Sequence, residues 1–375
     1  MSRTMRTRKI VLNALQDRTG GSGISMMVRE LFSRYTAISG EKCEVIVSGD
    51  NPHDYSGRGA SIVRAPLGDG DDLKRMVFLT FRMGLKYCRK AALLTSDAQI
   101  PLFLPFTTKV YPVVTDLSMF RRPQDFRRSR VILWKAQYRM LRRRADTFFA
   151  ISEFTAGELA EILHIPREKI RIAYCACPSG IERVTDEKEL RRVKEKYGLP
   201  DKYVFFAGND NYRKNFANMI AAFCRIKEET GMPHGFVLAG KAFQSRDVRE
   251  FAEKAQCGIH MIGYAGGEDI SALYSGADAV LYPSLYEGFG IPILEAQRCG
   301  TPVLAAEGSS LKEAGGEGAL YADPQSVDSI AKNLRRILFD EGLRAELIRK
   351  GYENEKRFSW DASAKIIRDA IEGNK

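Results

Sequence analysis

At 375 residues the chain is long enough for two α/β domains, and its 44% hydrophobic and 28% charged residues are typical of a soluble globular protein rather than a disordered one. No apolar run approaches the roughly 18 residues that a membrane helix needs, and the basic start leads only into a short strand-like run, so neither a spanning nor a secreted protein is expected. The formal charge of +11 is local: residues 121–144 hold ten Arg or Lys and one acid, which is +9, and the rest of the chain carries only +2.

The first half of the chain alternates short apolar runs with longer amphipathic ones, which predicts strands alternating with helices. Such alternation is typical of an α/β domain whose mostly parallel sheet carries helices on both faces. The expected strands are 10–15, 43–48, 61–65, 91–95, 110–114, 147–151 and 170–173, with helices near 25–33, 73–89, 129–144 and 155–163.

A glycine-rich loop, with Gly20, Gly21 and Gly23, stands between the first strand and the first helix. Its bare N–H groups and the following helix N-terminus can hold a phosphate, although a tight loop without a ligand explains the same residues. The pattern is not Gly-x-Gly-x-x-Gly, so a dinucleotide site is not indicated.

Metal sites and hydrolase-type catalysis gain no support from the sequence. Asp69, Asp71 and Asp72 look like a metal-binding Asp-x-Asp, but they lie in a glycine-rich stretch with no strand directly ahead, which favours a solvated loop. The four histidines have no ligand partner at useful spacing. We expect no metal and no cofactor.

The basic segment 121–144 predicts an amphipathic helix, because apolar residues recur at helical spacing among the arginines, at Val131, Trp134, Tyr138 and Leu141. One interpretation is a helix docked by this stripe with its charges in water. The other is attraction to an anionic membrane surface or a phosphate-bearing acceptor, at about 1 kcal/mol per basic residue near anionic lipid. No nucleic-acid-reading motif accompanies the charge, so no nucleic acid partner is expected.

Seven cysteines are scattered along the chain, and only Cys175 and Cys177 lie close together. An odd count without metal-ligand spacing favours reduced thiols in a cytoplasmic protein.

A second alternation of strands and helices begins at 203. Two such α/β units side by side leave a cleft at the carboxyl ends of both sheets, where open α/β folds bind ligands. The expected strands are 203–208, 236–239, 259–262, 279–282 and 302–305, with helices 215–230, 245–255, 270–275, 293–299, 327–339 and 360–371.

A charged stretch poor in strand formers, 178–200, separates the two series and predicts the inter-domain connection. The expected organisation is a first Rossmann-like domain 1–183, a linker 184–200, a second Rossmann-like domain 201–355 and a terminal helix 356–375.

Two clusters in the second half carry the chemistry. Arg213 and Lys214 stand where a helix begins after the first strand, and two cations at a helix N-terminus suit a diphosphate. Glu287 and Glu295 flank a Gly-Phe-Gly turn between a strand and a helix, and their carboxylates can hold two hydroxyl-bearing parts of one extended ligand.

The span from Glu287 to Glu295 resembles the E-x7-E motif of the retaining GT-B-fold glycosyltransferases, especially family 4. The resemblance covers nearly the whole chain, and further landmarks follow in family order at 20–23, 116–118, 151–155, 166–170, 206–215, 299–303 and 320–324. It implies a GT-B fold, in which two Rossmann-like domains face each other across a cleft and a C-terminal helix crosses back to the first domain.

The resemblance also implies residue roles. Glu287, with the glycine turn, contacts the donor sugar, Arg213 and Lys214 hold the diphosphate, and these three residues are the expected catalytic ones. Glu295 holds the ribose hydroxyls. The implied donor-binding residues are Gly20, Gly21, Gly23, Thr115, Asp116, Gly208, Asn209, Gly263, Tyr264, Gly288, Phe289, Gly290, Leu294 and Glu295.

Two positions depart from the family pattern. Thr115 stands where many members have a histidine that touches the donor sugar, and a threonine cannot carry a positive charge. Asn209 stands where many members have an arginine, so Arg213 would have to bind the phosphate in its place. These departures leave open the choice of donor and the turnover.

We therefore expect a metal-independent, retaining transfer of a sugar from a nucleotide diphosphate sugar, with GDP-mannose or a UDP-sugar favoured, to a hydroxyl of a lipid-linked or surface-polysaccharide glycan. The expected location is the cytoplasm or the inner face of the membrane, with 121–144 as the contact to anionic lipid. The alternative is a non-catalytic protein that binds a nucleotide sugar or a glycan. An epimerase or a phosphorylase of the same fold is less favoured, because the acid pairs of the first and the cofactor-binding lysine of the second are not recognisable.

Overall fold

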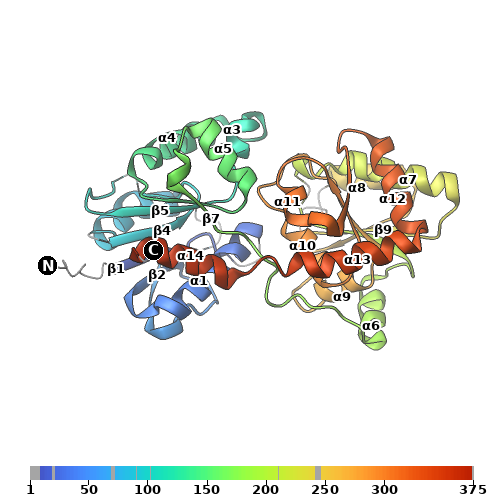
Figure 1. Cartoon of the computed structure of the whole chain (residues 1–375), viewed down its shortest axis with the longest axis horizontal. Helices are drawn as coiled ribbons and strands as arrows, with labels where there is room; N and C mark the ends of the chain where they lie inside the picture. The colour runs from blue at the N-terminus through green and yellow to red at the C-terminus, as the bar shows by residue number, and fades with distance from the viewer. Residues whose placement is uncertain are drawn as a thin grey trace. The chain divides into compact units, whose positions relative to one another are not determined.

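The computed structural model describes residues 9–18, 22–68, 72–89, 91–101, 103–209, 211–240 and 246–373, and the chain divides into two compact units (Figure 1). Unit 1 comprises Met1–Cys175 and Ser359–Lys375, and unit 2 comprises Ala176–Phe358. The chain thus passes from unit 1 into unit 2 and returns to unit 1 with its last helix.

The described residues of unit 1 form a seven-stranded parallel sheet in the order β3-β2-β1-β4-β5-β6-β7. The interior strand β1 pairs with β2 on one side and β4 on the other, and its Ile10 lies opposite Cys43 and Ala92. Helices bury both faces of such a sheet, which explains why its strands are continuous apolar runs. The strands are β1 Lys9–Asn13, β2 Cys43–Ser48, β3 Ser61–Ala65, β4 Ala91–Ser96, β5 Lys109–Val114, β6 Phe148–Ala150 and β7 Ile170–Ile172.

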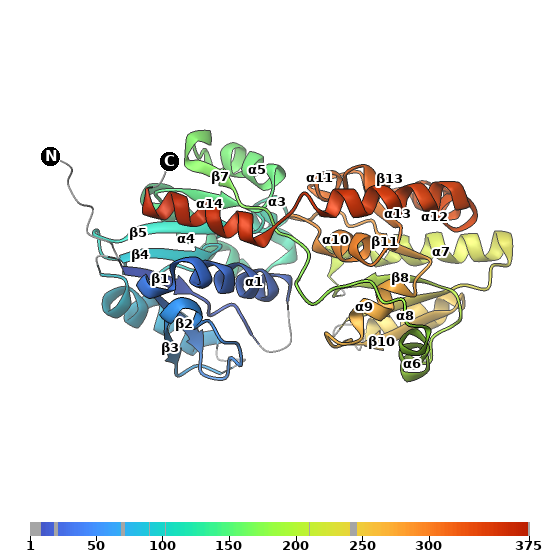
Figure 2. The same cartoon turned by 60° about the horizontal axis from the view of Figure 1, so that its bottom comes forward.

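The C-terminal helix α14 (Trp360–Glu372) packs against α1 (Gly23–Ser39), and the two helices lie side by side in Figures 1 and 2. Ser363 Oγ donates to Tyr174 O at 2.7 Å, which fastens α14 to the last residues of the first segment of unit 1, Met1–Cys175. The expected return of the last helix to the first domain is therefore confirmed. The other helices of unit 1 are α2 Asp72–Val77, the π-helix η3 Phe78–Tyr87, α3 Ser118–Arg121, α4 Arg128–Arg144 and α5 Glu153–Leu163.

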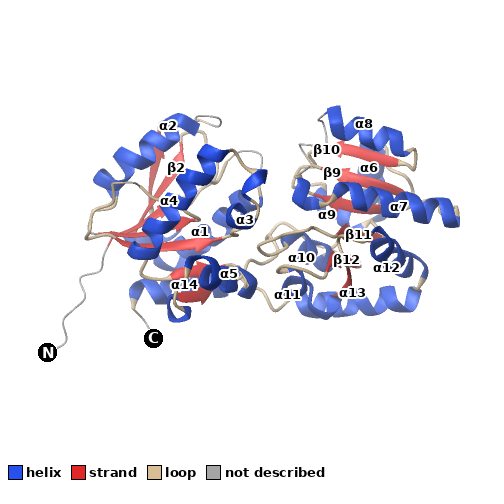
Figure 3. Cartoon of the chain, turned by 90° about the horizontal axis from the view of Figure 1, so that it is seen from above, coloured by secondary structure: helices blue, strands red, loops and turns tan. Residues whose placement is uncertain are grey.

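The described part of unit 2 forms a six-stranded parallel sheet in the order β10-β9-β8-β11-β12-β13 (Figure 3). Its strands are β8 Tyr203–Ala207, β9 Gly235–Ala239, β10 Ile259–Gly263, β11 Ala279–Tyr282, β12 Val303–Ala306 and β13 Ala319–Ala322. Its helices are α6 Glu187–Tyr197, α7 Phe216–Thr230, α8 Arg246–Ala255, α9 Ile270–Ser275, α10 Ile291–Arg298, α11 Leu311–Gly315, α12 Val327–Phe339 and α13 Glu341–Glu355. The fold class of two Rossmann-like α/β domains is confirmed.

Four elements of unit 2 go beyond the sequence-based expectation: α6, α11, β13 and α13. Helix α6 lies within the stretch predicted as a linker, where it packs against α9 and Asp186 caps its first turn. Strand β13 is as short as β11 and β12, but its burial pattern is mixed, with Leu320 and Tyr321 only partly buried, whereas β11 and β12 are buried throughout. In α13 only Leu347 is a buried large apolar residue, so the helix has no apolar stripe to read.

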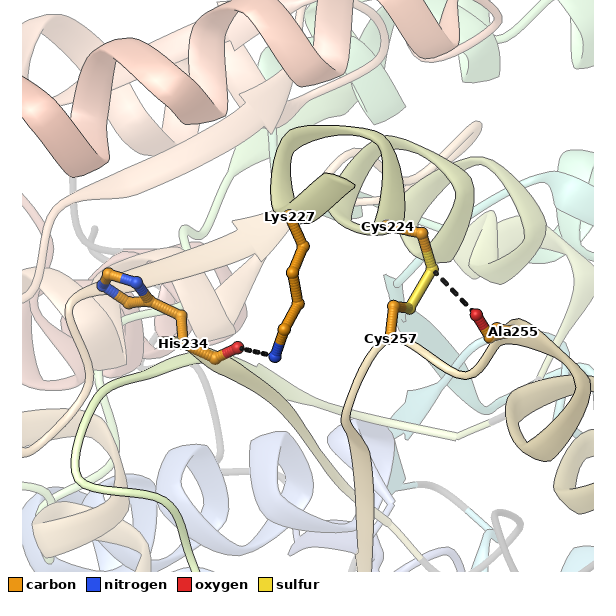
Figure 4. The surroundings of a disulfide bond; sticks show 5 residues. All are labelled: Cys224, Lys227, His234, Ala255 and Cys257. Atoms are coloured by element: carbon orange, nitrogen blue, oxygen red, sulfur yellow. Dashed lines mark hydrogen bonds between the residues drawn. A yellow bond between two sulfur atoms is a disulfide. The ribbon is translucent and has the colours of Figure 1, made fainter. Parts of the chain in front are cut away.

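A disulfide between Cys224 and Cys257 contradicts the expectation that all thiols are reduced (Figure 4). It joins α7 to the turn before β10, where the two Cα atoms lie 5.2 Å apart, a spacing that a disulfide requires. Nearby, Lys227 Nζ donates to His234 O at 2.7 Å and holds the end of α7 to the start of β9. A separation of 33 residues in sequence left no local sign of this pairing. The other five cysteines are free and buried.

No helix within the described ranges is long and apolar enough to cross a membrane.

Candidate functional site

The segments of unit 2 that the sequence predicted to bind a donor follow the carboxyl ends of its strands. Strand β8 leads into Gly208 and Asn209, and β11 leads into the turn that carries Glu287. Because β8 and β11 are neighbours in the sheet, these two loops begin next to each other. In open parallel sheets this edge is where ligands bind.

An ion pair joins the two loops. The short helix η6 (Tyr212–Lys214) places Lys214 Nζ 2.6 Å from Glu287 Oε1, and both side chains are only 13% exposed. Lys214 also donates to the Tyr282 hydroxyl, which in turn donates to Glu287 Oε1 at 3.2 Å. The three side chains form a closed network, which accounts for the burial of two charges.

Both members of the pair are held in their charged forms. Burial alone would raise the pKa of Glu287, but the Lys214 ammonium and the Arg213 guanidinium hold it below its ordinary value. Burial alone would lower the pKa of Lys214, but Glu287 and Tyr282 raise it above its ordinary value. A cation and an anion are therefore both present here at neutral pH.

The turn after Glu287 is shaped by hydrogen bonds and by one glycine. Ser310 Oγ donates to the carbonyl oxygens of Glu287 and Phe289, each at 2.9 Å. Gly290 has φ 115°, and a Cβ there would lie 2.7 Å from Leu311 Cδ2, so any residue with a Cβ would be strained at this position and would displace the Leu311 side chain. The Gly-Phe-Gly turn is thus a fixed part of the unit rather than a loose loop.

The turn is also tied to the basic pair through the backbone. Leu285 N donates to Arg213 O at 2.7 Å, and the Arg213 guanidinium lies 5.9 Å from the centre of the Tyr286 ring. Arg213, Lys214 and Glu287 are therefore brought together, as the sequence predicted for the catalytic residues.

Glu295 lies on α10, separately from that network. The Tyr274 hydroxyl donates to Glu295 Oε2 at 2.6 Å. Burial raises the pKa of Glu295, and the bond from Tyr274 opposes this shift only in part. Glu287 and Glu295 thus stand in opposite electrostatic environments: within the described part of the chain, cations lower the pKa of Glu287, whereas burial dominates at Glu295.

The other predicted donor-binding residues of unit 2 fall into two groups. Asn209 and Tyr264 are exposed at the carboxyl ends of β8 and β10, and Gly263, with φ 70°, forms the bend before Tyr264. Phe289 and Leu294 are buried in the packing of the unit. Gly208 and Gly288 belong to the two loops, and their donor-binding roles, like the others, stay predictions.

In unit 1, Thr115 and Asp116 follow the carboxyl end of β5. Asp97, at the end of β4, accepts the Thr115 N–H at 2.8 Å and the Thr115 hydroxyl at 2.8 Å. Burial raises the pKa of Asp97 to about 7, against the effect of the bonds from Thr115. Sequence reasoning missed Asp97, whose position directly after an apolar strand was its only sign.

A second missed group surrounds Asp17, after β1. Its fully buried carboxylate accepts from Ser25 Oγ at 2.8 Å, from Arg29 Nη2 at 3.1 Å and from the Tyr55 hydroxyl at 2.6 Å. These bonds fix the start of α1, where Gly23 lies. Gly20 and Gly21 lie outside the described residues.

Helix α4 confirms the amphipathic helix predicted for the basic segment. Val131, Tyr138 and Leu141 are buried, and Trp134 is partly buried.

No group of three or more His, Cys, Asp or Glu side chains that could hold a metal ion occurs among the residues described. Asp69 and Asp71 lie outside those residues, and only the backbone of Asp72 is described, at the start of α2.

Known proteins resemble this chain in sequence and in fold. Residues 187–354 match the family described as "Glycosyl transferases group 1". The chain is 32% identical over 251 residues to the O-antigen chain mannosyltransferase B of Escherichia coli, a match that covers 66% of this chain and 65% of that protein. It is 31% identical over 237 residues to the serotype-specific mannosyltransferase WbdA of Escherichia coli, covering 61% of this chain and 29% of that one. The chain thus spans slightly less than two thirds of the first relative and less than one third of the second.

Solved structures match the whole chain. Sucrose-phosphate synthase from Thermosynechococcus elongatus superposes with a TM-score of 0.77 at 19% identity, over 98% of this chain and 99% of that one. HepE from Anabaena, solved in complex with UDP and glucose, superposes with a TM-score of 0.72 at 15% identity, over 98% and 100% of the two chains. At these identities the likeness concerns the fold alone.

Proposed function

We propose that this chain, which belongs to the group 1 glycosyltransferases of family 4 with the GT-B fold, transfers a sugar from a nucleoside diphosphate sugar to a hydroxyl group of a glycan, with retention at the anomeric carbon. The observation that carries the proposal is the buried Lys214–Glu287 pair at the carboxyl ends of β8 and β11. A fixed cation beside a fixed carboxylate suits a ligand that is anionic at one end and polyhydroxylated at the other.

The basic pair would act on the leaving group. When the bond from the anomeric carbon to the diphosphate breaks, negative charge develops on the departing oxygen, and preorganised cations lower that barrier. The Lys214 ammonium has three protons, of which Glu287 and Tyr282 accept two, so one is left for a phosphate oxygen. Arg213 adds a planar, permanently charged guanidinium at the same loop.

The two glutamates would hold different parts of the donor. Glu287, ionised beside Lys214, accepts hydrogen bonds from sugar hydroxyls and positions the anomeric carbon. Glu295 accepts hydrogen bonds from the ribose hydroxyls through Oε1, because Oε2 already accepts the hydrogen bond from Tyr274. In the transfer the acceptor oxygen bonds to the anomeric carbon on the face that the diphosphate leaves, and its proton passes to the departing phosphate oxygen.

The proposed donor is GDP-mannose or a UDP-sugar, and the proposed acceptor is a lipid-linked or surface-polysaccharide glycan. An O-antigen chain mannosyltransferase and a serotype-specific mannosyltransferase among the relatives support mannose. A UDP-sugar is kept as the second donor class because HepE, a protein of the same fold, was solved with UDP. We propose that the transfer needs no metal and no cofactor, because Arg213 and Lys214 can neutralise the leaving group. We also propose that α4 contacts an anionic membrane, which would place the chain at the cytoplasmic face.

A donor panel tests the function. Purified protein is incubated with GDP-, UDP- and ADP-sugars and oligosaccharide acceptors, with and without EDTA, and nucleotide release and the anomeric configuration of the product are measured. We expect one donor class to give an EDTA-resistant product of retained configuration. Glu287→Ala should abolish turnover, whereas Glu253→Ala, an exposed glutamate on α8, should leave it unchanged. Full turnover by Glu287→Ala under saturating donor would reject the role of Glu287.

A non-catalytic, nucleotide-sugar-binding protein is the second candidate, and Thr115 favours it. The Thr115 hydroxyl is bonded to Asp97 and carries no charge, so it cannot replace a histidine that touches the donor. Binding of a donor with neither hydrolysis nor transfer in the same panel would select this candidate.

A further inference from the structure

Exposed apolar side chains are concentrated in unit 1. Of the nine large apolar side chains that are exposed in the described part of the chain, six fall between residues 77 and 132. They are Val77, Phe81, Leu85, Phe103, Phe106 and Ile132, with exposed fractions from 49% to 94%. A gathering of this kind marks an interaction surface, whereas scattered single residues would not.

Five of these side chains, here called the apolar ridge, form one surface: Val77, Phe81, Leu85, Phe103 and Phe106. The first three recur every fourth residue along α2 and η3, which puts them on one side of that helix. The Phe81 and Phe103 ring centres lie 5.6 Å apart, so the loop 103–106 continues the surface.

Helix α4 is fastened to the end of this ridge. Arg144 donates to Leu104 O at 3.2 Å and to Pro105 O at 2.7 Å, and its guanidinium lies 5.1 Å from the Phe106 ring centre. Residues of η3, the loop and α4 also share one buried core cluster, so the three segments cover the same face of the sheet. The basic helix and the apolar ridge are therefore parts of one surface.

The charge of this surface has a single sign. Segments 73–89, 101–109 and 126–145 hold fourteen Lys or Arg and no acid, which exceeds the formal net charge of +11 of the whole chain; of the fourteen, Arg75 is buried and does not reach the surface. Asp146, the acid that follows them, pairs with Lys109 at 3.1 Å. Along η3, the exposed cations Arg82 and Lys86 alternate with the apolar ridge. On α4, exposed arginines surround Ile132 on the outer face of the helix.

We propose that the apolar ridge inserts into the headgroup region of an anionic lipid bilayer while α4 and the cations of η3 bind the lipid phosphates. Aromatic and aliphatic side chains beside Lys and Arg are the composition of interfacial membrane contacts, where apolar burial and charge attraction add. A second copy of the chain is a poorer occupant, because two such faces would bring like charges together. The inference rests on the proposed contact of α4 with an anionic membrane and deepens it by naming the apolar side chains that insert. It is separate from the proposed transfer, because lipid binding needs neither a donor nor the residues of unit 2.

Vesicle flotation of the full chain tests the inference. Phosphatidylcholine vesicles with phosphatidylglycerol are compared with vesicles of phosphatidylcholine alone, using the wild type and Phe81→Ser/Phe106→Ser. We expect binding to the anionic vesicles only, and a partition coefficient at least about tenfold lower for the double variant, because two phenyl groups no longer leave water. The matched control is Phe339→Ser, an exposed phenylalanine at the end of α12 in unit 2, which should bind like the wild type.

A second arm tests the charges and the depth of insertion. Arg139→Glu/Arg143→Glu on the outer face of α4 should weaken binding, and added salt should weaken it in the wild type. In a Trp134→Phe background, in which the remaining native tryptophan, Trp360, is buried, the fluorescence of Phe106→Trp should be quenched by brominated lipids, whereas that of Phe339→Trp should not.

Three outcomes would overturn the inference: equal binding to neutral vesicles, an unchanged partition coefficient for the double phenylalanine variant, or a wild-type dimer in sedimentation that the same variant loses. The last result would assign the ridge to self-association. Glu287→Ala should still float with anionic vesicles, and the double variant should keep its thermal transition and its turnover on a soluble acceptor. Loss of lipid binding and loss of transfer are thereby distinguished.

Discussion

Lys214 and Glu287 form a nearly buried ion pair whose atoms Nζ and Oε1 lie 2.6 Å apart, although the residues are 73 positions apart in sequence. Tyr282 closes the network from the strand that precedes Glu287. The pair holds the loop after β8 to the loop after β11. Stability and the proposed chemistry therefore depend on the same two side chains.

Removing one partner of this pair should cost more stability than removing both. Lys214→Met leaves the Glu287 carboxylate buried beside no ammonium, and we expect the free energy of unfolding to fall by about 3–5 kcal/mol. Lys214→Met/Glu287→Met should recover part of that loss while turnover stays absent. Urea unfolding of the single and double variants measures the coupling as a double-mutant cycle.

The exposed pair Lys312 and Glu307, 3.9 Å apart, is the matched control. Both side chains are more than half exposed, so Lys312→Met should change the unfolding free energy by less than about 1 kcal/mol. Equal losses at the two sites would contradict the buried character of the Lys214–Glu287 pair.

Asp97 should make the protein less stable as pH rises from about 4 to about 7. Its pKa in the folded chain is about 7 and its ordinary value is 3.8, so the folded state binds the extra proton between these limits. The stabilisation is fully present below the ordinary value and is lost as pH approaches the folded one, by roughly 2–4 kcal/mol. Asp97→Asn, which can still accept the Thr115 N–H, should remove this part of the pH dependence.

Urea unfolding of the wild type and Asp97→Asn at several pH values gives the contribution of Asp97 as a difference, because all other titrating groups are shared. If the difference in unfolding free energy between the two proteins does not change with pH above pH 4, Asp97 is ionised in the folded chain at acidic pH and the prediction is wrong.

The sequence predicted the Lys214–Glu287 region because its signals are local. Each residue lies in the loop between an apolar strand and a helix, and such strand–loop–helix patterns can be read within about a dozen residues. Asp97 also follows a strand, but its significance comes from Thr115, 18 positions later, and from complete burial. Contacts of this kind depend on which strands become neighbours, and no residue pattern within either segment records that.

The disulfide should contribute to the stability of unit 2. Cys224 and Cys257 close a loop of 33 residues, and a cross-link of that size stabilises by about 3.7 kcal/mol, mainly by restricting the unfolded chain. Dithiothreitol should therefore lower the thermal transition of the wild type. Cys224→Ser/Cys257→Ser should start at the lower transition and should not respond to the reductant.

Cys43 supplies the control for this experiment, since its thiol is free, buried and located in unit 1. Cys43→Ser should keep the full response to dithiothreitol. A wild-type transition that dithiothreitol leaves in place, with reduction of the cysteines verified by mass spectrometry, would contradict a stabilising disulfide.

Gly290 should be irreplaceable, because alanine there meets two obstacles at once. A φ of 115° is unfavourable for any residue with a Cβ, and that Cβ would press on Leu311. We expect Gly290→Ala to lower the unfolding free energy by about 2–4 kcal/mol and to reduce turnover strongly, since the turn after Glu287 must shift. Gly308→Ala is the matched control, because nothing lies within 4 Å of a Cβ at this exposed position, and it should be neutral in both measurements. Urea unfolding and donor-panel turnover of the two variants decide the matter: a Gly290→Ala protein as stable and active as Gly308→Ala would mean that the turn tolerates a side chain.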